Sequence, residues 1–256
     1  METKLQNFQW QKPEVVPAFV QGVDAEAVYK SLSGMNLGWN DYQTKTQTLR
    51  GSNPFIAARI DTLVRPYGIR VANLRDLSRP EVMSIVKDRY YADIPAFVAH
   101  YADIPAFVLR TMEDSNSRNL TLIKRLAEEV ERVNGKLELP LMVTGFDVVP
   151  LENDNNGYGI TIAPRDDFKA IHDDKLKGEY NGRTFSEVDE LGLPKFDSRC
   201  FDFDRSGSRT WYARQKGVSG LCLYGRLDLG SGSKDLAGSH SDGRIVLISG
   251  EGSAKN

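Results

Sequence analysis

The sequence predicts an α+β protein, because one strongly amphipathic helix lies among segments that alternate between apolar and polar residues. The helix is expected over residues 119–134, where apolar side chains recur every three or four positions. Alternating segments follow the helix at 137–149 and 158–162, and another lies near the C-terminus at 221–229. A strong helix that packs on several strands is typical of an α+β domain.

The composition is that of an ordinary globular protein. The chain has 256 residues, of which 40% are hydrophobic and 27% charged, and this length is sufficient to bury a large core. The formal net charge of −2 gives no electrostatic reason to expect nucleic acid as a partner. No apolar run is long enough for a membrane-spanning helix, and the N-terminus lacks a signal-peptide pattern. We expect cytoplasmic synthesis, with a virion or the cell surface left open as the final location.

Motifs of the common catalytic and cofactor-binding classes are absent from the sequence. It contains no P-loop, dinucleotide fingerprint, zinc-ligand spacing or nucleophile elbow. Cys200 and Cys222 are too few for a disulfide framework and are expected to be thiols. We therefore expect a binding protein rather than an enzyme, with calcium as the one cofactor left open. Asp202 and Asp204 are the calcium candidates, although Ala213 stands where a glutamate closes such a loop.

The first 75 residues are expected to form a smaller α/β region that precedes a second domain over residues 76–256. Asp24 and Asn53 are suitable helix N-caps, and Ser78 and Glu81 have the spacing of a capping box. The elements expected here are helices over 24–33 and 53–63, a strand over 67–74, and a helix that begins near Ser78.

The octapeptide YADIPAFV occurs twice, at Tyr91–Val98 and at Tyr101–Val108. A period of ten matches no helical or solenoid repeat, so an in-frame duplication is the simplest explanation. The two copies would compete for one place in the fold. We expect Tyr101–Arg110 to hold it, because this copy continues directly into the C-terminal part of the chain.

The C-terminal part is expected to contain further helices and strands. Ser117 is expected to cap the helix over 119–134, and Gly135 to end it. The capping-box spacing from Thr184 to Glu187 predicts a short helix, and Trp211 is expected to be a core residue. The elements are strands over 137–149 and 158–162, a charged surface segment over 166–175, a helix over 184–191, and strands over 210–214 and 244–249.

The stretch Ser219–Ser249 combines regularly spaced leucines with small polar residues. Leucines at 221, 223, 227 and 229 have a period of two, so they should face a core while the polar residues face solvent. Frequent glycine and serine disfavour a stable helix. The polar positions are Tyr224, Arg226, Asp228, Gly230, Gly232, Ser233, Asp235, Gly238, His240 and Asp242.

These polar residues share a property of their codons. Each can be reached from an asparagine codon by changing adenines alone, an operation that cannot produce Lys, Gln, Glu, Trp or Met. From Ser219 to Gly243 only Lys234 belongs to this excluded group, whereas Trp211 and Lys216 lie just upstream. The pattern predicts a segment, about 219–243, that is diversified at adenines.

Two runs of sequence resemble the variable proteins of diversity-generating retroelements. They are YNGRTFSEVDELGLPKFD (Tyr180–Asp197) and Ser208–Gly250, which contains SRTWYARQKGVSGLCL and DGRIVLIS. The resemblance extends from about Tyr101 onward, and it is to members from small-genome bacteria and from archaea with their viruses. In that family a reverse transcriptase copies a template repeat with errors at adenines and overwrites the 3′ end of the target gene.

The resemblance implies a C-type-lectin-like domain that binds a ligand through a hypervariable surface. The contacts would come from the ten polar positions named above, with Tyr224 and Arg226 expected to contribute most, since Tyr and Arg dominate many interfaces. A protein or a cell-surface ligand is the expected partner. The alternative is an undiversified, calcium-dependent lectin-like domain that binds a ligand or lies on a viral surface.

Overall fold

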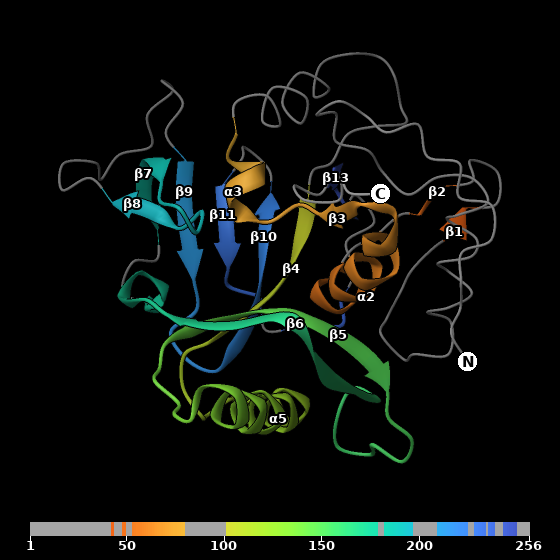
Figure 1. The fold of residues 1–256 in the computed structure, drawn as a ribbon. Coiled ribbons are helices and arrows are strands. Elements are labelled where there is room, and N and C mark those ends of the chain that lie inside the picture. The colour runs from red at the N-terminus through yellow and green to blue at the C-terminus, as the bar shows by residue number, and fades with distance from the viewer. Residues whose placement is uncertain are drawn as a thin grey trace.

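A nine-stranded mixed sheet forms the centre of the structure (Figure 1). The computed structural model describes residues 42–43, 48–49, 53–79, 101–178, 182–196, 209–224, 228–233, 235–238 and 243–249. The strands of this sheet are β4 (Tyr101–Leu109), β5 (Leu141–Pro150), β6 (Ile160–His172), β7 (Arg183–Val188), β8 (Pro194–Phe196), β9 (Arg209–Ala213), β10 (Val218–Tyr224), β11 (Asp228–Ser231) and β12 (Gly243–Arg244). Their order is β6-β5-β4-β10-β11-β9-β7-β8, and β12 pairs with β4 outside this path.

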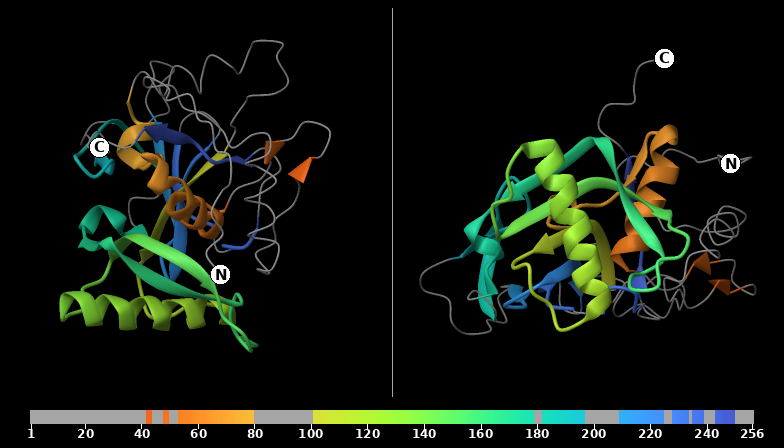
Figure 2. Two further views of the ribbon diagram at one scale, coloured as in Figure 1. Left: turned by 45° about the vertical axis from the view of Figure 1, so that its right-hand side comes forward. Right: turned by 90° about the horizontal axis from the view of Figure 1, so that it is seen from below.

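Helices pack on this sheet, which confirms the predicted α+β class. The helix α2 (Pro54–Val64) packs on β4 and β5, and α5 (Ser117–Asn134) packs against β6, so that the β5–β6 hairpin lies between them (Figure 2). The remaining elements are β1 (Tyr42–Gln43), β2 (Thr48–Leu49), η1 (Arg65–Tyr67), β3 (Ile69–Val71), α3 (Leu74–Leu77), η2 (Asp174–Leu176) and β13 (Leu247–Ser249). Across the described ranges, no helix combines the length and apolarity needed to cross a membrane.

The second copy of the duplicated octapeptide is strand β4, in the middle of the sheet between β5 and β10. This confirms the place expected for Tyr101–Arg110, whereas the first copy, Tyr91–Val98, lies outside the described residues. Pro105 cannot donate a ladder hydrogen bond, and it is accommodated where the pairing with β10 shifts register between Gly220 and Leu221.

Helix α5 is the helix predicted over residues 119–134. Its N-cap is Asn116 rather than Ser117, because the Asn116 side chain accepts a hydrogen bond from a backbone N–H of the first turn. Gly135 ends the helix with a φ of 73°, as predicted. Leu122, Ile123, Leu126 and Val130 form the buried face. Val133, expected on the same face, is 46% exposed in the last turn.

The β5–β6 hairpin is longer than predicted, because the charged segment from residue 166 continues strand β6 as far as His172. Leu141 pairs with His172, and the register shifts between Thr144 and Phe146. This bulge brings the two backbones very close together. Gly145 has a φ of 72°, and a Cβ at this position would lie 2.2 Å from the carbonyl oxygen of Asp167, so only glycine fits.

The described part of the N-terminal region shares its core with the rest of the chain. Helix α2 begins as predicted, since the Asn53 side chain accepts the Ile56 N–H at 3.0 Å. Strand β3 pairs with β13 close to the end of the chain. Phe55 on α2 lies in one buried cluster with Phe107 and Phe146 of the main sheet. The domain division at residue 75 stays a prediction.

Two local predictions are wrong. The segment predicted as a helix over 184–191 forms β7, because pairing with β9 and β8 and the burial of Phe185 override the local capping-box spacing. The closing strand predicted over 244–249 is divided into β12 and β13. The chain crosses from β4 to β3 between them, where the Val246 carbonyl accepts the Ala72 N–H at 2.8 Å.

Two predicted helices depend on residues that the structure does not describe. The helix predicted over 24–33 lies outside the described residues. Ser78 is the C-cap of α3, and the helix predicted to begin near it would extend beyond residue 79, where the description stops.

Candidate functional site

The predicted variable segment begins inside the main sheet. Strand β10 pairs antiparallel with β4 and β11, and β11 pairs parallel with β9. Trp211 on β9 is 0% exposed, which confirms it as a core residue. It shares a buried cluster with Leu221, Leu223 and Leu229. The leucines therefore face a core, as their period of two predicts.

Strand β10 is covered on both faces, and of Tyr224, the one predicted polar position that it contains, only the backbone is described. Leu221 and Leu223 pack in the cluster around Trp211. Gly220 lies against α2, and a Cβ at this position would be 2.9 Å from Cγ of Pro54. Ser219 and Cys222 are also buried, and the Cys222 thiol donates to the Gly230 carbonyl at 3.5 Å.

Asp228 and Gly230 are buried in β11, so the prediction that both face solvent is wrong. Asp228 is 8% exposed, and its Oδ1 accepts the backbone N–H of Thr210 at 2.7 Å. Gly230 is paired with Cys222 on one side and with Tyr212 on the other. These two positions join neighbouring strands, because β11 has a partner along both of its edges.

The loop after β11, described at residues 232–233 and 235–238, contains the exposed polar positions. Gly232, Ser233, Asp235 and Gly238 are all exposed, as predicted. Leu236 and Ala237 lie between them in sequence but are 1% and 9% exposed, and both belong to the cluster of α2 and β4. The loop is therefore fixed to the core by two apolar side chains while its polar residues stay in contact with water.

The exposed positions differ in how freely they accept a new side chain. A Cβ at Gly232 would have no atom within 4 Å. A Cβ at Gly238 would lie 2.6 Å from Oδ2 of Asp235, whose other oxygen accepts the Gly238 N–H at 3.0 Å. Ser233 Oγ donates to the Asp235 carbonyl at 3.3 Å. Position 232 therefore accepts a large side chain freely, whereas position 238 does so only if Asp235 moves.

A buried arginine fixes the strands on which the loop begins. Arg110 follows β4 and is 5% exposed. Its guanidinium donates to Ser219 Oγ on β10 at 2.8 Å, to Ser231 Oγ on β11 at 2.9 Å, and to the Leu176 carbonyl. Burial, with a smaller contribution from Arg214, lowers the pKa of Arg110 to about 9. Ser231, the last residue before the loop, is thereby held in one position.

A second polar cluster lies beside the loop. Tyr158 donates its hydroxyl to Asn119 Oδ1 on α5 at 2.6 Å and is 4% exposed. Burial, with a smaller contribution from the nearby charge of Asp235, raises the pKa of Tyr158 to about 12. Burial opposes ionisation of Asp114, but hydrogen bonds from Asn116 and Arg214 hold its pKa below the ordinary value.

Several predicted site residues lie wholly or partly beyond the described residues. Arg226, His240 and Asp242 are outside them, as are the calcium candidates Asp202 and Asp204. The structure describes only the backbone of Tyr224, which pairs with Tyr101 and Asp228. Among the residues that are described, no three His, Cys, Asp or Glu side chains are grouped to hold a metal ion. Calcium binding stays a prediction.

Sequence reasoning missed the residues that support the site. Arg110, Asp114, Asn119 and Tyr158 come from segments far upstream of the loop, and no spacing in the sequence links them to it. The one available signal was Arg110 itself, a charge directly after an apolar strand. Searches against family models, curated proteins and solved structures find no match to this chain.

Proposed function

We propose that this protein binds a ligand through a hypervariable surface, diversified by adenine-directed retroelement mutagenesis on a C-type-lectin-like scaffold. The observation that carries the proposal is the division of one continuous segment into two parts. Leu223, Leu229 and Leu236 are buried, whereas the described polar residues of the loop after β11 are exposed. A diversified binder needs this combination, since its exposed side chains must change without loss of the fold.

Of the ten positions predicted to contact a ligand, only part are both described and exposed. Gly232, Ser233, Asp235 and Gly238 are the members of that set which are both described and exposed. Three of these side chains are small or absent, so this variant offers few atoms for contact there. Tyr224 and Arg226 stay the proposed strongest contributors, because large side chains of these types dominate binding at interfaces.

Rigidity of the scaffold supports the proposed mode of binding. Leu236 and Ala237 attach the loop to the core, and Arg110 fixes the strand that leads into it. A loop that is already ordered loses less conformational entropy when it binds, so more of the contact energy appears as affinity. We propose a protein or a cell-surface ligand as the partner, with several copies of the site compensating for weak single contacts.

A displayed library tests the binding function. Codons 232, 233, 235 and 238 would be randomised in one library, and codons 228, 230 and 231 in a matched control. Both libraries would be selected against several unrelated folded proteins. We expect specific binders from the loop library and mostly unfolded clones from the control, because the control positions are buried. A well-folded loop library that yields no binder to any target would contradict the proposal.

A further inference from the structure

A cavity of about 420 Å³ lies on the opposite side of β4 from the loop's supporting strand β11, between α3 and the β5–β6 bulge. Its walls come from β3 and α3, from β4, from the two bulged strands, and from the turn between β7 and β8. Apolar side chains make up much of its lining: Val71, Leu74, Ile104, Pro105, Met142, Ile171 and Leu191. This volume lies within the range of about 300–1,000 Å³ that is usual for small-molecule sites.

Two glycines hold the walls of this cavity at fixed separations. Gly192, in the turn between β7 and β8, has a φ of 80°, and a Cβ there would lie 2.3 Å from the backbone nitrogen of Arg75. Gly145 makes a similar close approach to Asp167 at the bulge. The β7–β8 turn is thereby packed directly on α3, and β5 on β6. These two close approaches of backbone to backbone fix the separation of the elements whose side chains line the cavity.

Most charged groups around the cavity are already paired. Asp61, which is 1% exposed, accepts hydrogen bonds from Arg65 at 2.8 Å and from Arg165 at 2.7 Å. Arg70 forms a bidentate ion pair with Asp76. These pairs neutralise one another and stiffen the wall. They leave few charged groups for a ligand.

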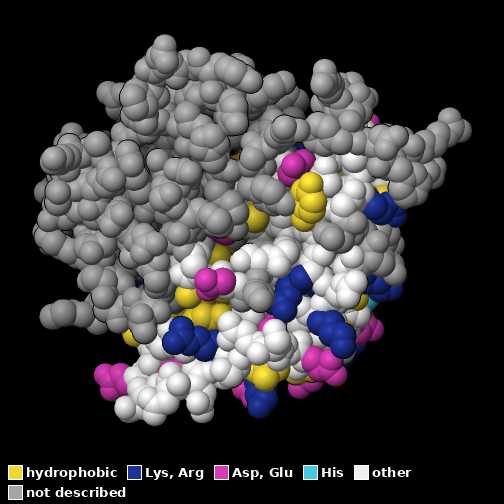
Figure 3. Space-filling model, turned by 180° about the vertical axis from the view of Figure 1, so that it is seen from behind, with side chains coloured by type: hydrophobic (Ala, Val, Ile, Leu, Met, Phe, Trp, Pro, Cys, Tyr) yellow, Lys and Arg dark blue, Asp and Glu magenta, His cyan; other side chains and the backbone are white. Residues whose placement is uncertain are grey.

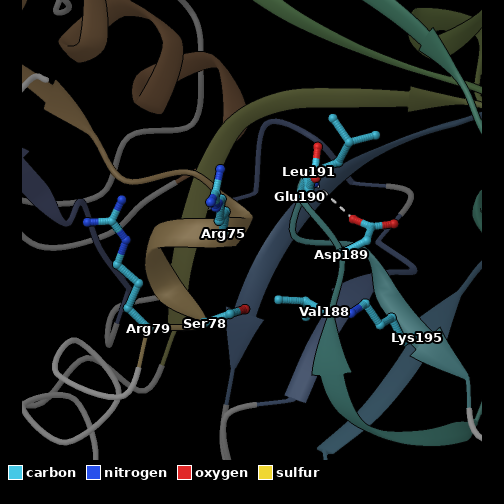
Figure 4. A pocket seen from close by; sticks show the side chains of 8 residues that line it. All are labelled: Arg75, Ser78, Arg79, Val188, Asp189, Glu190, Leu191 and Lys195. Atoms are coloured by element: carbon cyan, nitrogen blue, oxygen red, sulfur yellow. Dashed lines mark hydrogen bonds between the residues drawn. The ribbon is translucent and has the colours of Figure 1, made fainter. Parts of the chain in front are cut away.

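Two cations on the lining are different. Arg75 of α3 and Lys169 of β6 are exposed, and the side chain of neither makes a hydrogen bond or an ion pair with any described residue. Arg75 also lines an adjoining hollow of about 730 Å³, together with Glu190 and Leu191 of the β7–β8 turn (Figure 4). These two cations differ from the described surface seen from behind, where basic and acidic side chains are intermingled (Figure 3).

We propose that this cavity binds a small organic carboxylate, with its apolar body on the lining and its carboxylate paired with Arg75 and Lys169. Arg and Lys side chains form their strongest hydrogen bonds with ionised oxygens, which supplies the attraction. The apolar lining selects against a bare inorganic anion. Glu190, which also lines the cavity, repels a second negative charge and so favours a carboxylate over a doubly charged phosphate ester.

Calorimetric titration of the full chain tests this proposal, with benzoate as the probe. Phenyl phosphate, benzyl alcohol and acetate would be the comparison ligands. We expect benzoate to bind most tightly, since it alone combines one negative charge with a ring that fits the apolar lining. The proposal is overturned if benzoate shows no binding, if benzyl alcohol binds equally well, or if phenyl phosphate binds more tightly.

Charge-removing variants locate the site. The double variant Arg75→Gln with Lys169→Gln should weaken benzoate binding by about tenfold or more, because both charged donors are lost. Its thermal unfolding should match that of the parent, since neither side chain has a hydrogen-bond or ion-pair partner among the described residues. Lys124→Gln, which removes an exposed charge on α5, should leave binding unchanged. Glu190→Gln should strengthen benzoate binding. The assignment is overturned if the affinity for benzoate is unchanged both in this variant and in the double variant.

Discussion

Strand β11 and the loop after it use the same residue types in opposite environments. Asp, Gly and Ser occur in the strand as Asp228, Gly230 and Ser231, all of them buried. They occur again in the loop as Gly232, Ser233 and Asp235, all of them exposed. The comparison shows that residue type does not decide which positions of this segment are buried and which are exposed.

Strand pairing decides which of these positions are buried and which are exposed. Leu229 and Gly230 pair with both neighbouring strands, whereas Asp228 pairs with β10 and Ser231 with β9. The sheet is covered on both faces by apolar clusters. After Ser231 the chain leaves β9 and β10, so its backbone no longer has partners along both edges. The three matched pairs of residues provide the controls for the predictions below.

The glycine pair should give the largest difference. Gly230→Tyr forces a large side chain into a buried strand, and we expect the free energy of unfolding to fall by about 3 kcal/mol. Gly232→Tyr should change it by less than about 0.5 kcal/mol, because a Cβ there meets no atom within 4 Å. Urea denaturation of both variants measures the difference. Equal losses would show that position 232 is packed in solution.

The aspartate pair comes next. Asp228→Ala leaves the buried N–H of Thr210 without its acceptor, so we expect a loss of about 2 kcal/mol. Asp235→Ala loses one exposed hydrogen bond to Gly238 and should cost less than about 1 kcal/mol. Thermal unfolding ranks the two variants. A greater loss at Asp235 would contradict the buried role assigned to Asp228.

The serine pair tests the support from Arg110. Ser231→Ala removes an acceptor from the buried guanidinium, and we expect a loss of about 1.5 kcal/mol, typical of a hydrogen bond to a charged group. Ser233→Ala should stay within about 0.5 kcal/mol. Hydrogen exchange near residue 231 should also accelerate in the first variant alone. Unchanged exchange there would mean that Arg110 does not hold this strand.

The next prediction concerns pH, and its effect at about pH 11 is smaller than those above. The raised pKa of Tyr158 means that the folded state keeps this proton up to about pH 12, whereas the unfolded state loses it near the ordinary value of 10.0. The resulting stability is complete below pH 10 and is lost as pH rises through 12. At about pH 11 roughly 1 kcal/mol should already be lost. Tyr158→Phe should remove this part of the pH dependence.

The Asp235 charge contributes to this shift, which adds a test of the loop's position. Asp235→Asn should lower the Tyr158 pKa, because it removes a negative charge that opposes ionisation. Ultraviolet titration of tyrosinate follows the change directly. An unaltered Tyr158 titration in this variant would place the loop farther from Tyr158 than the structure has it.

Elements with strong local patterns could be predicted from the sequence. Helix α5 has an unbroken apolar stripe and a C-terminal glycine, and β9 contains the core residue Trp211, so local chemistry sufficed. The segment Arg183–Val188 was wrongly predicted as part of a helix, because its capping-box spacing is a local signal. Its pairing with β9 involves residues far along the chain. The burial of Asp228 depends on Thr210 in the same way.

The central claim is that this segment is diversified in nature while its framework is kept. Sequencing the locus across a natural population tests it most directly. We predict substitutions confined to codons between about 219 and 243, matching adenines in a nearby template copy, with Gly232, Ser233, Asp235 and Gly238 among the variable positions. If these codons vary no more than those of Trp211 and Ile245, the claim is contradicted and the loop is a fixed feature of the fold.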